Sequence, residues 1–363
     1  MAKSRSSPVN STAALARHLG LSRWTVSRAI NGHPEVTPET SERVKAAMVE
    51  LGFVPNPFGR ALRGARTRTV GVSFRELETP ILVRKAAVIQ KLLRARGFRP
   101  LFEIIDEGAN SGLEVVRHFH SMQVEGVIMV DANVGAAGKP WQDYLAAQRI
   151  PTVLLEPRGA VEHNAILVER RAALAQVTDF LFGLGHRHFA LLGIDRSFPF
   201  GVPRCDGVAD ALAAHGARFE DCVETIMQSN RRFDSFDYGR ELAEFLLGRP
   251  TLPTALIALN DEIAAGALWH LQRAGLVVPR DVSLVGFDNM PIANHTSPRL
   301  TTVDQQVNEL VAAATGMLFD LLGAKPGTLL PTRHVQAQLV RRDSVAPPPR
   351  SVPGFKIRPH GLT

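Results

Sequence analysis

The chain has 363 residues, of which 45% are hydrophobic and 21% are charged, so it is long enough to bury more than one core. Its net charge is +7, and residues 1–68 carry all of this excess, because they contain eleven Lys and Arg against four Asp and Glu. Only two cysteines occur, Cys205 and Cys222, which argues against a disulfide framework and favours a reducing cytoplasm. No apolar run could cross a bilayer and residues 1–11 lack the apolar core of a signal peptide, so we expect a cytoplasmic protein with no membrane partner.

Residues 11–31 predict two short helices joined by a tight turn, which is a helix-turn-helix layout. Ser11 can cap the first helix, Gly20 ends it, and Ser22 can cap the second. Residues 1–10 before it are small, polar and basic, and we expect a flexible arm there. Three apolar residues of the second helix recur at helical spacing and are expected to be buried: Val26, Ala29 and Ile30.

A third helix is predicted from Pro38 to about residue 51, with Thr37 as its cap and Gly52 after its end. Its apolar face would close a small three-helix core within residues 11–54. The following segment, residues 55–68, permits a short helix and carries four arginines.

Three stretches carry a resemblance to a known family: LSRWTVSRAIN at 21–31, VTPETSERVKAAMVELGFVPN at 36–56 and RALRGARTRTVGV at 60–72. Together they resemble the N-terminus of the lactose-repressor (LacI-type) family of bacterial transcription regulators. The likeness continues more loosely through GLGHRHFALLG, ALIALNDEIAAGAL and DVSLVGFDN, and so covers residues from about 11 to 342. In this family the second helix enters the major groove of DNA.

The second helix supplies the candidate DNA-reading residues. Arg28 falls on its groove-facing side and can make a bidentate contact with guanine. The resemblance places Arg23 and Trp24 at the two positions that set operator choice. Trp24 has two interpretations, contact with a thymine methyl or a sugar, and packing in the core of the small domain.

Further DNA contacts follow from the resemblance. Thr25, Ser27 and Asn31 match phosphate-contacting positions, where hydroxyl and amide groups fix the register without reading sequence. Residues 55–68 match the family's hinge helix, in which Leu62 stands at the position that wedges into the minor groove. The alternative for Leu62 is packing against the rest of the chain.

From residue 69 onward, short apolar runs alternate with helical stretches, which is typical of parallel sheets covered by helices. Strands are predicted at 69–74, 99–105, 126–130, 151–155, 165–168, 188–193, 222–227, 255–259 and 282–287. Helices are predicted at 83–96, 112–122, 142–148, 172–184, 207–214, 238–247 and 262–274. So many units favour two sheets, and hence an α/β body behind an all-α head.

The resemblance implies that this body, residues 69–343, has the periplasmic-binding-protein type I arrangement of two Rossmann-like subdomains. The N-subdomain would comprise about 69–166 and 296–328, and the C-subdomain about 167–295 and 329–343, with crossovers near 167, 295 and 330. Residues 344–363 contain PPPR, VPGF and RPHG without apolar periodicity, so a disordered tail is expected. No leucine-rich heptad helix follows, and a homodimer is therefore expected.

Four residues match family positions that bind a small-molecule effector between the subdomains: Glu156, Arg204, Asn260 and Asp288. Their fork donor, amide and carboxylates suit a sugar or a related metabolite. Each also has a structural interpretation, because Asn260 and Asp288 could cap strand ends and Glu156 could be a surface charge.

The chain departs from the family at 79–82, where Thr-Pro-Ile-Leu replaces Asn-Pro-Phe-Phe and removes the usual aromatic stacking surface. An altered effector, or none, follows from that change. No catalytic or cofactor motif is visible: the sequence has no GxxxxGK[ST] run and no GxSxG elbow, and its paired histidines lack a third metal ligand.

These features predict a dimeric DNA-binding repressor, not an enzyme, that recognises a pseudo-palindromic operator under control of a small effector. The alternatives are a helix-turn-helix fused to a sugar-modifying enzyme, a DNA-binding protein without an effector, and a solute-binding protein without a regulatory role. The basic first 68 residues argue against the last of these.

Overall fold

In a computed structural model of the protein, the chain forms two compact units, residues 1–67 and residues 68–363. The structure describes residues 11–30, 33–54, 66–105, 111–228 and 235–351, together with the backbone of 356 and 357. None of the helices in these described ranges combines the length and the apolar character that a membrane span requires.

The first unit contains the three predicted helices, α1 (Thr12–Leu19), α2 (Arg23–Ile30) and α3 (Pro38–Glu50). Their caps form as the sequence predicts. The Ser11 hydroxyl accepts a hydrogen bond from the Ala14 amide at 3.1 Å, and the Ser22 hydroxyl accepts one from the Thr25 amide at 3.0 Å. Gly20 has a φ of +64°, a left-handed conformation that ends α1 and aims the chain into α2.

A small apolar core holds the three helices together. Arg43 of α3 adds a hydrogen bond to the carbonyl oxygen of Leu19 at 2.7 Å, which ties the third helix to the end of the first. Of the residues expected in this core, Ile30 is only partly buried. The buried members are Leu15, Ala16, Leu19, Val26, Ala29, Val44, Ala47 and Phe53.

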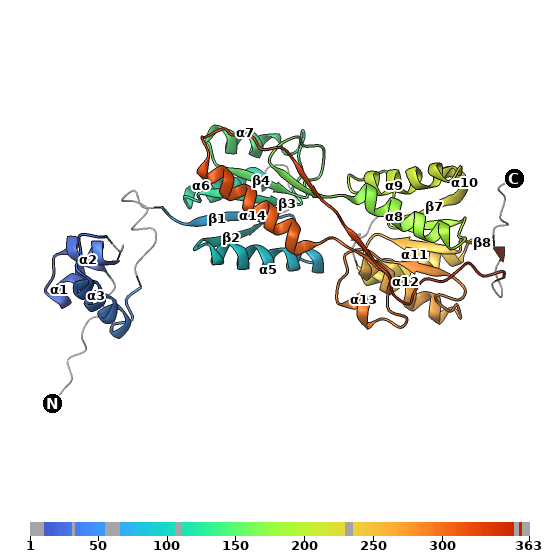
Figure 1. Cartoon of the computed structure of the whole chain (residues 1–363), viewed down its shortest axis with the longest axis horizontal. Coiled ribbons are helices and arrows are strands. Elements are labelled where there is room, and N and C mark those ends of the chain that lie inside the picture. The colour runs from blue at the N-terminus through green and yellow to red at the C-terminus, as the bar shows by residue number, and fades with distance from the viewer. Residues whose placement is uncertain are drawn as a thin grey trace, which may run out of the picture. The chain divides into compact units, whose positions relative to one another are not determined.

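The second unit contains two parallel sheets, each covered by helices on both faces (Figure 1). The first sheet has the strand order β12 (Arg333–Val335), β5 (Ala165–Val168), β4 (Thr152–Leu155), β3 (Gly126–Val130), β1 (Thr69–Phe74) and β2 (Arg99–Ile104). One of its faces packs on α5 (Pro80–Ala95) and α14 (Val307–Gly323). The other packs on α6 (Ser111–Ser121) and α7 (Lys139–Ala147).

The second sheet has the order β10 (Ser283–Val285), β9 (Ala255–Ala258), β6 (Phe189–Leu192) and β7 (Val223–Ile226). Helices α8 (Arg170–Gly183) and α9 (Gly201–Ala214) pack together on it, as do α11 (Phe236–Leu247) and α12 (Asp261–Arg273). Two one-turn helices, α10 (Phe219–Cys222) and α13 (Ile292–His295), complete this part. Both sheets show the alternation of strands and helices that was predicted from the sequence. Helix α14 was not among the predicted helices.

The first crossing between the sheets lies between Val168 and Arg170, close to the expected residue 167, whereas the second and third lie later in the chain than expected. Strand β12 pairs with β5 in the first sheet, so the third crossing follows Val335 rather than residue 330. Val303 still packs in the second core whereas Val307 packs in the first, which moves the second crossing from about 295 to 304–306. Strands β11 (Thr302–Asp304) and β13 (Gln338–Val340) pair antiparallel and bind these two connections to each other.

The expectation of a disordered tail from residue 344 is wrong for its first residues. The Ser344 side chain is buried, accepting a hydrogen bond from the Thr301 amide at 2.8 Å and donating one to the carbonyl of Leu284 at 2.6 Å. The Ala346 carbonyl oxygen lies 2.9 Å from His186 Nε2. Further along, β14 (Lys356–Ile357) pairs with β8 (Thr251–Leu252). Hydrogen bonds, rather than a repeating apolar pattern, therefore hold this segment against the second sheet.

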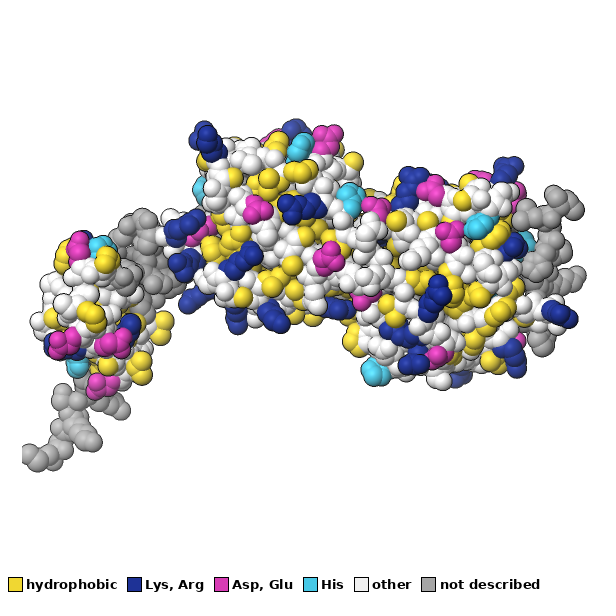
Figure 2. All heavy atoms as spheres, viewed as in Figure 1, with side chains coloured by type: hydrophobic (Ala, Val, Ile, Leu, Met, Phe, Trp, Pro, Cys, Tyr) yellow, Lys and Arg dark blue, Asp and Glu magenta, His cyan; other side chains and the backbone are white. Residues whose placement is uncertain are grey.

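Residues 69–363 carry equal numbers of basic and acidic side chains. Figure 2 shows the two signs interspersed over one face of this unit. Charge therefore distinguishes the two units: the first one holds all of the excess positive charge except that of Arg68, which begins the second.

A close helix crossing generates our first prediction. A Cβ at Gly266 of α12 would lie 1.9 Å from the carbonyl oxygen of Phe236 in α11, so Gly266→Ala must push the two helices apart. We expect the free energy of unfolding to fall by about 2 kcal/mol or more, measured by urea denaturation. Gly316→Ala is the matched control, because nothing lies within 4 Å of a Cβ there, and alanine favours helix. Equal stability of the two variants would contradict the packing.

Candidate functional site

The exposed side of α2 is the first candidate surface. Trp24 is 61% exposed, so the interpretation that placed it in the core of the head is wrong. Arg23 is also exposed, and Thr25, Ser27 and Arg28 are half-buried along the same helix. An aromatic side chain of this size at the start of a helix-turn-helix recognition helix can contact DNA without first being uncovered.

Arg28 has two partners on this surface. Its guanidinium carbon lies 3.8 Å from the centroid of the Trp24 ring, a cation–π contact, and its Nη1 forms an ion pair with Glu35. Both partners are accessible to solvent, so the guanidinium is held at the protein surface. Its Nη1, which pairs with Glu35, is buried, so both arms of the fork can read guanine only after that ion pair opens.

The polar residues at the start of α2 also lie at the surface. The Thr25 hydroxyl lies 2.8 Å from the Ser22 hydroxyl, in the first turn of the helix, where amide donors and the helix dipole favour a phosphate. Asn31 and Leu62, two further predicted DNA contacts, lie outside the described residues, as does most of the predicted hinge.

A buried cluster of charged groups between the two sheets is the second candidate site. Its carboxylates follow the carboxyl ends of strands, the edge at which parallel α/β sheets bind ligands. Asp131 comes directly after β3, and Glu156 comes directly after β4. Asp288 comes three residues after the end of β10, the edge strand of the second sheet. All three are buried in the described structure.

Glu156 is the most heavily contacted member of this cluster. It is 2% exposed, so its interpretation as a surface charge is wrong. The Val168 amide donates to its Oε1 at 2.6 Å, Arg170 Nη2 donates to its Oε2, and Lys85 Nζ lies 3.7 Å from Oε2. Burial acts to raise the pKa of Glu156, but the charges of Arg170 and Lys85 hold that pKa below its ordinary value.

Asp288 and Arg204 form the other half of the cluster. Gln305 Nε2 donates to Asp288 Oδ1, while Arg204 Nη1 donates to the carbonyl of Phe200 at 2.8 Å. The Arg204 guanidinium also stacks over Phe287, 4.6 Å from the ring centroid. Burial raises the pKa of Asp288 to about 6, against the opposing charges of Arg204 and Lys85.

Three of the four predicted effector residues are therefore brought together: Glu156, Arg204 and Asp288 are linked through the charges of Lys85 and other buried groups. The fourth is committed elsewhere. Asn260 is buried, and its Oδ1 caps α12 by accepting a hydrogen bond from the Ile263 amide at 2.9 Å. The observed contact of Asn260 is thus a structural one, in which the residue that follows β9 caps the next helix.

Sequence reasoning missed Lys85 and Arg170. Lys85 is 3% exposed and lies on the face of α5 that carries Ile81, Leu82 and Ile89, so a charged residue in that apolar face was a usable signal. Arg170 begins α8 directly after the first crossing, and the local sequence contains no such signal for it.

Asp131 and Arg158 form a further ion pair in this region, joined by two hydrogen bonds of 2.9 Å.

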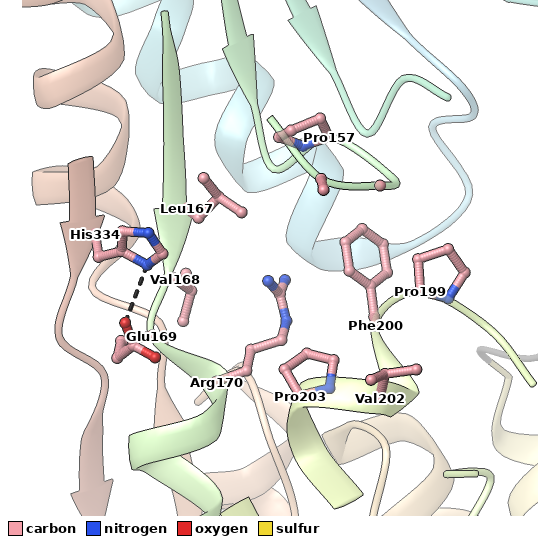
Figure 3. A pocket seen from close by; sticks show the side chains of 12 residues that line it. Pro157, Leu167, Val168, Glu169, Arg170, Pro199, Phe200, Val202, Pro203 and His334 are labelled. Carbon is pink, nitrogen blue, oxygen red and sulfur yellow. Dashed lines mark ion pairs between the residues drawn. The ribbon is translucent and has the colours of Figure 1, made fainter. Parts of the chain in front are cut away.

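A pocket of about 290 Å³ opens beside this cluster. Figure 3 shows Arg170 projecting into it between Leu167 and Phe200, while Glu169 turns aside toward His334, at 3.0 Å. Most of its lining is apolar: Pro157, Gly159, Ala160, Leu167, Val168, Pro199, Phe200, Val202 and Pro203. Within the described residues, no group of three His, Cys, Asp or Glu could hold a metal ion.

Two family profiles match the chain. The profile of bacterial regulatory proteins of the lacI family matches residues 14–56, and that of a periplasmic binding protein-like domain matches residues 178–345. Among curated proteins, the HTH-type transcriptional regulator MalR of Streptomyces coelicolor is 31% identical over 355 residues, which cover 96% of this chain and 98% of MalR.

Solved structures show the same arrangement. A lac repressor dimer bound to operator and the anti-inducer ONPF matches with a TM-score of 0.82 and 24% identity, over 94% of this chain and 100% of that one. A complex of the transcriptional regulator CelR with cellobiose matches with a TM-score of 0.66 and 27% identity, over 92% of this chain and 99% of that one.

The neighbouring buried carboxyl of Asp261 generates a prediction about pH. Burial and the charge of Asp288 raise the pKa of Asp261 to about 8 from a model-peptide value of 3.8. The folded protein thus holds this proton more tightly than the unfolded chain, and its free energy of unfolding should fall as the pH rises from about 4 to about 8. A single such group contributes up to about 1.4 kcal/mol per pH unit.

Asp261→Asn removes the titrating group and leaves an amide to meet Thr302 and the Met290 amide, which now contact its two oxygens. We expect the variant to lose part of the pH dependence, measured by chemical denaturation at pH 5, 7 and 9. An unchanged slope relative to the parent protein would contradict the raised pKa.

Proposed function

Because the chain belongs to the lacI family of bacterial regulatory proteins, we propose that it binds a pseudo-palindromic operator as a homodimer and represses transcription under control of a small effector. The observation that carries the DNA-binding role is the confinement of the excess positive charge to residues 1–68. That segment contains the three-helix unit with its exposed recognition helix, and phosphate neutralisation supplies most of the non-specific affinity for DNA.

In this proposal Arg28 reads guanine, and its contact with Trp24 presents the guanidinium toward the groove. Arg23 and Trp24 set the choice of operator. Thr25, Ser27 and Asn31 contact phosphates and fix the register, and Leu62 wedges into the minor groove at the centre of the site.

The homodimer would place two such heads on the two halves of the operator. The matched lac repressor structure is a dimer bound to operator. On this chain, Trp269 of α12 is 42% exposed and stands edge-on to Phe236 of α11, with ring centroids 6.4 Å apart. Exposed aromatic pairs of this kind are enriched at protein interfaces, so we assign the dimer contact to this face.

The effector would bind between the two sheets. Glu156, Asn260 and Asp288 follow strand ends there, and Arg204 lies in the first turn of α9. The matched CelR structure holds cellobiose, and a sugar or related small metabolite is the corresponding ligand class for this chain. Because three connections join the sheets, a ligand that prefers one relative orientation of the two lobes shifts the dimer between two poses. Its effect on DNA binding is limited to its difference in affinity for those poses.

We further propose that the chain catalyses no reaction and acts in the cytoplasm. The curated relatives are transcriptional regulators. A repressor must reach chromosomal DNA to act.

Arg28→Ala tests the DNA-reading role. We expect a loss of about 1–3 kcal/mol in operator binding, with salt-sensitive binding to random duplex retained, measured by mobility shift at several salt concentrations. Lys45→Ala, which removes an exposed basic residue of α3, is the matched control for charge alone. An equal loss on operator and random DNA would count against base reading by Arg28.

Trp269→Glu tests the dimer face. We expect the variant to be monomeric by light scattering coupled to size exclusion, because a buried charge at the centre of an interface is unpaired. Phe245→Glu is the matched control, since Phe245 lies nine residues after Phe236 on α11 and so projects from its opposite side. A dimer that survives Trp269→Glu would place the interface elsewhere.

A further inference from the structure

The pocket beside the charged cluster contains a buried cation with an unused donor. Arg170 is 6% exposed, its Nη2 donates to Glu156, and its guanidinium carbon lies 4.6 Å from the centroid of Phe200. The Nε of Arg170 is buried and has no hydrogen-bond acceptor among the described residues. A buried N–H without a partner is costly, so this donor is a place where a ligand oxygen would gain free energy.

Charge around this donor is unbalanced in the positive direction. Lys85 and Arg170 both contact the single carboxylate of Glu156, which also accepts the Val168 amide. Asp131 is occupied by Arg158 through two hydrogen bonds, so it does not neutralise the second of these cations. Glu156 is thus the one carboxylate, among the described residues, in direct contact with both Lys85 and Arg170, and burial lowers the pKa of Lys85 against the attraction of that carboxylate. A buried positive charge that shares its carboxylate is costly unless a further anion pairs with it.

Other anions near the pocket are directed elsewhere. Asp288 accepts from Gln305 and interacts most strongly with the charge of Arg204. Glu169 lines the pocket, but its carboxylate pairs with His334 at 3.0 Å and turns away from Arg170, as Figure 3 shows. Neither carboxylate accepts the Arg170 Nε.

The walls of the pocket determine what kind of anion fits. Phe200 and its proline neighbours Pro199 and Pro203 approach from the second sheet's side, and Pro157 and Leu167 approach from the first. These walls offer little hydrogen bonding to hydroxyl groups. The expected sugar-binding acceptors are also engaged, because Asn260 caps a helix, Glu156 has three donors and Asp288 accepts from Gln305.

We propose that the effector of this chain is a small organic acid whose carboxylate binds Arg170 and whose apolar body lies against Phe200 and the proline-lined walls. This inference rests on the proposed function, since it names the chemical class of the effector. Because the walls come from both lobes, a bound acid contacts both and favours the pose in which they are closed around it.

The test uses the full-length protein and matched pairs of probes that differ in charge. Benzoate is compared with benzyl alcohol, and glucuronate with glucose, by isothermal titration calorimetry and by thermal shift. We expect benzoate to bind at least tenfold more tightly than benzyl alcohol, and glucuronate and glucose to bind more weakly than benzoate. Equal binding of benzoate and benzyl alcohol, or preferential binding of glucose, would overturn the inference.

Variants locate the site. Arg170→Gln should weaken benzoate binding at least tenfold, whereas Arg171→Gln should not, because Arg171 is exposed and pairs with Asp210 outside the pocket. Lys85→Met is the second variant, in case Arg170→Gln fails to fold: it leaves the Glu156–Arg170 pair and removes the surplus charge. It should weaken benzoate binding without changing the binding of benzyl alcohol. Loss in Arg171→Gln, or none in Lys85→Met, would overturn the assignment.

A mobility shift on operator selected with the wild-type protein separates this inference from the proposed function. If benzoate binds at Arg170 without changing operator affinity, the binding site is supported and effector control by it is contradicted. If glucose changes operator affinity while benzoate does not bind, effector control is supported and the organic-acid class is overturned.

Discussion

The buried contact of Glu156 with Lys85 and Arg170 is the constraint on which the body depends. It joins three elements that are distant in the sequence: α5, the end of β4 and the first turn of α8. Arg170 follows the first crossing directly, so this contact fixes the start of the second lobe against the first. Breaking this pair would leave an uncompensated charge in a low-dielectric interior, which is costly. Because Arg170 lies at the crossing, a ligand that binds Arg170 also affects how the two lobes are oriented.

A second buried group of polar contacts secures the other two crossings. Asp261 accepts from the Met290 amide and from Thr302, and Arg342 donates to the carbonyl of Leu300 and to Asn289. These contacts tie the start of α12 to the paired strands β11 and β13, which carry the chain between lobes. Both groups are polar because the connections run through the interface of two sheets, where backbone and side-chain donors need partners.

The sequence predicted those features that local chemistry decides. Ser11, Ser22 and Thr37 cap their helices as expected, because a capping residue needs only the amides that follow it. The sequence could not place the third crossing, since β12 has three residues and its pairing with β5, from Arg333↔Ile166 onward, depends on a register set 167 residues earlier. Arg170 was missed for the same reason: its partner Glu156 is defined by tertiary packing, whereas Lys85 interrupts an apolar helix face and was detectable in principle.

The two units divide the work by charge and by structure. Residues 1–68 carry the positive excess and the exposed recognition helix, and the electrically neutral remainder carries the buried cluster and the pocket.

The most direct test of the DNA-binding role is selection of duplexes from a random library by the purified full-length protein, followed by affinity measurement at a fixed salt concentration. The account predicts a two-fold-symmetric sequence bound at least about 10³-fold more tightly than a scrambled duplex. Equal affinity for selected and scrambled duplexes would contradict it.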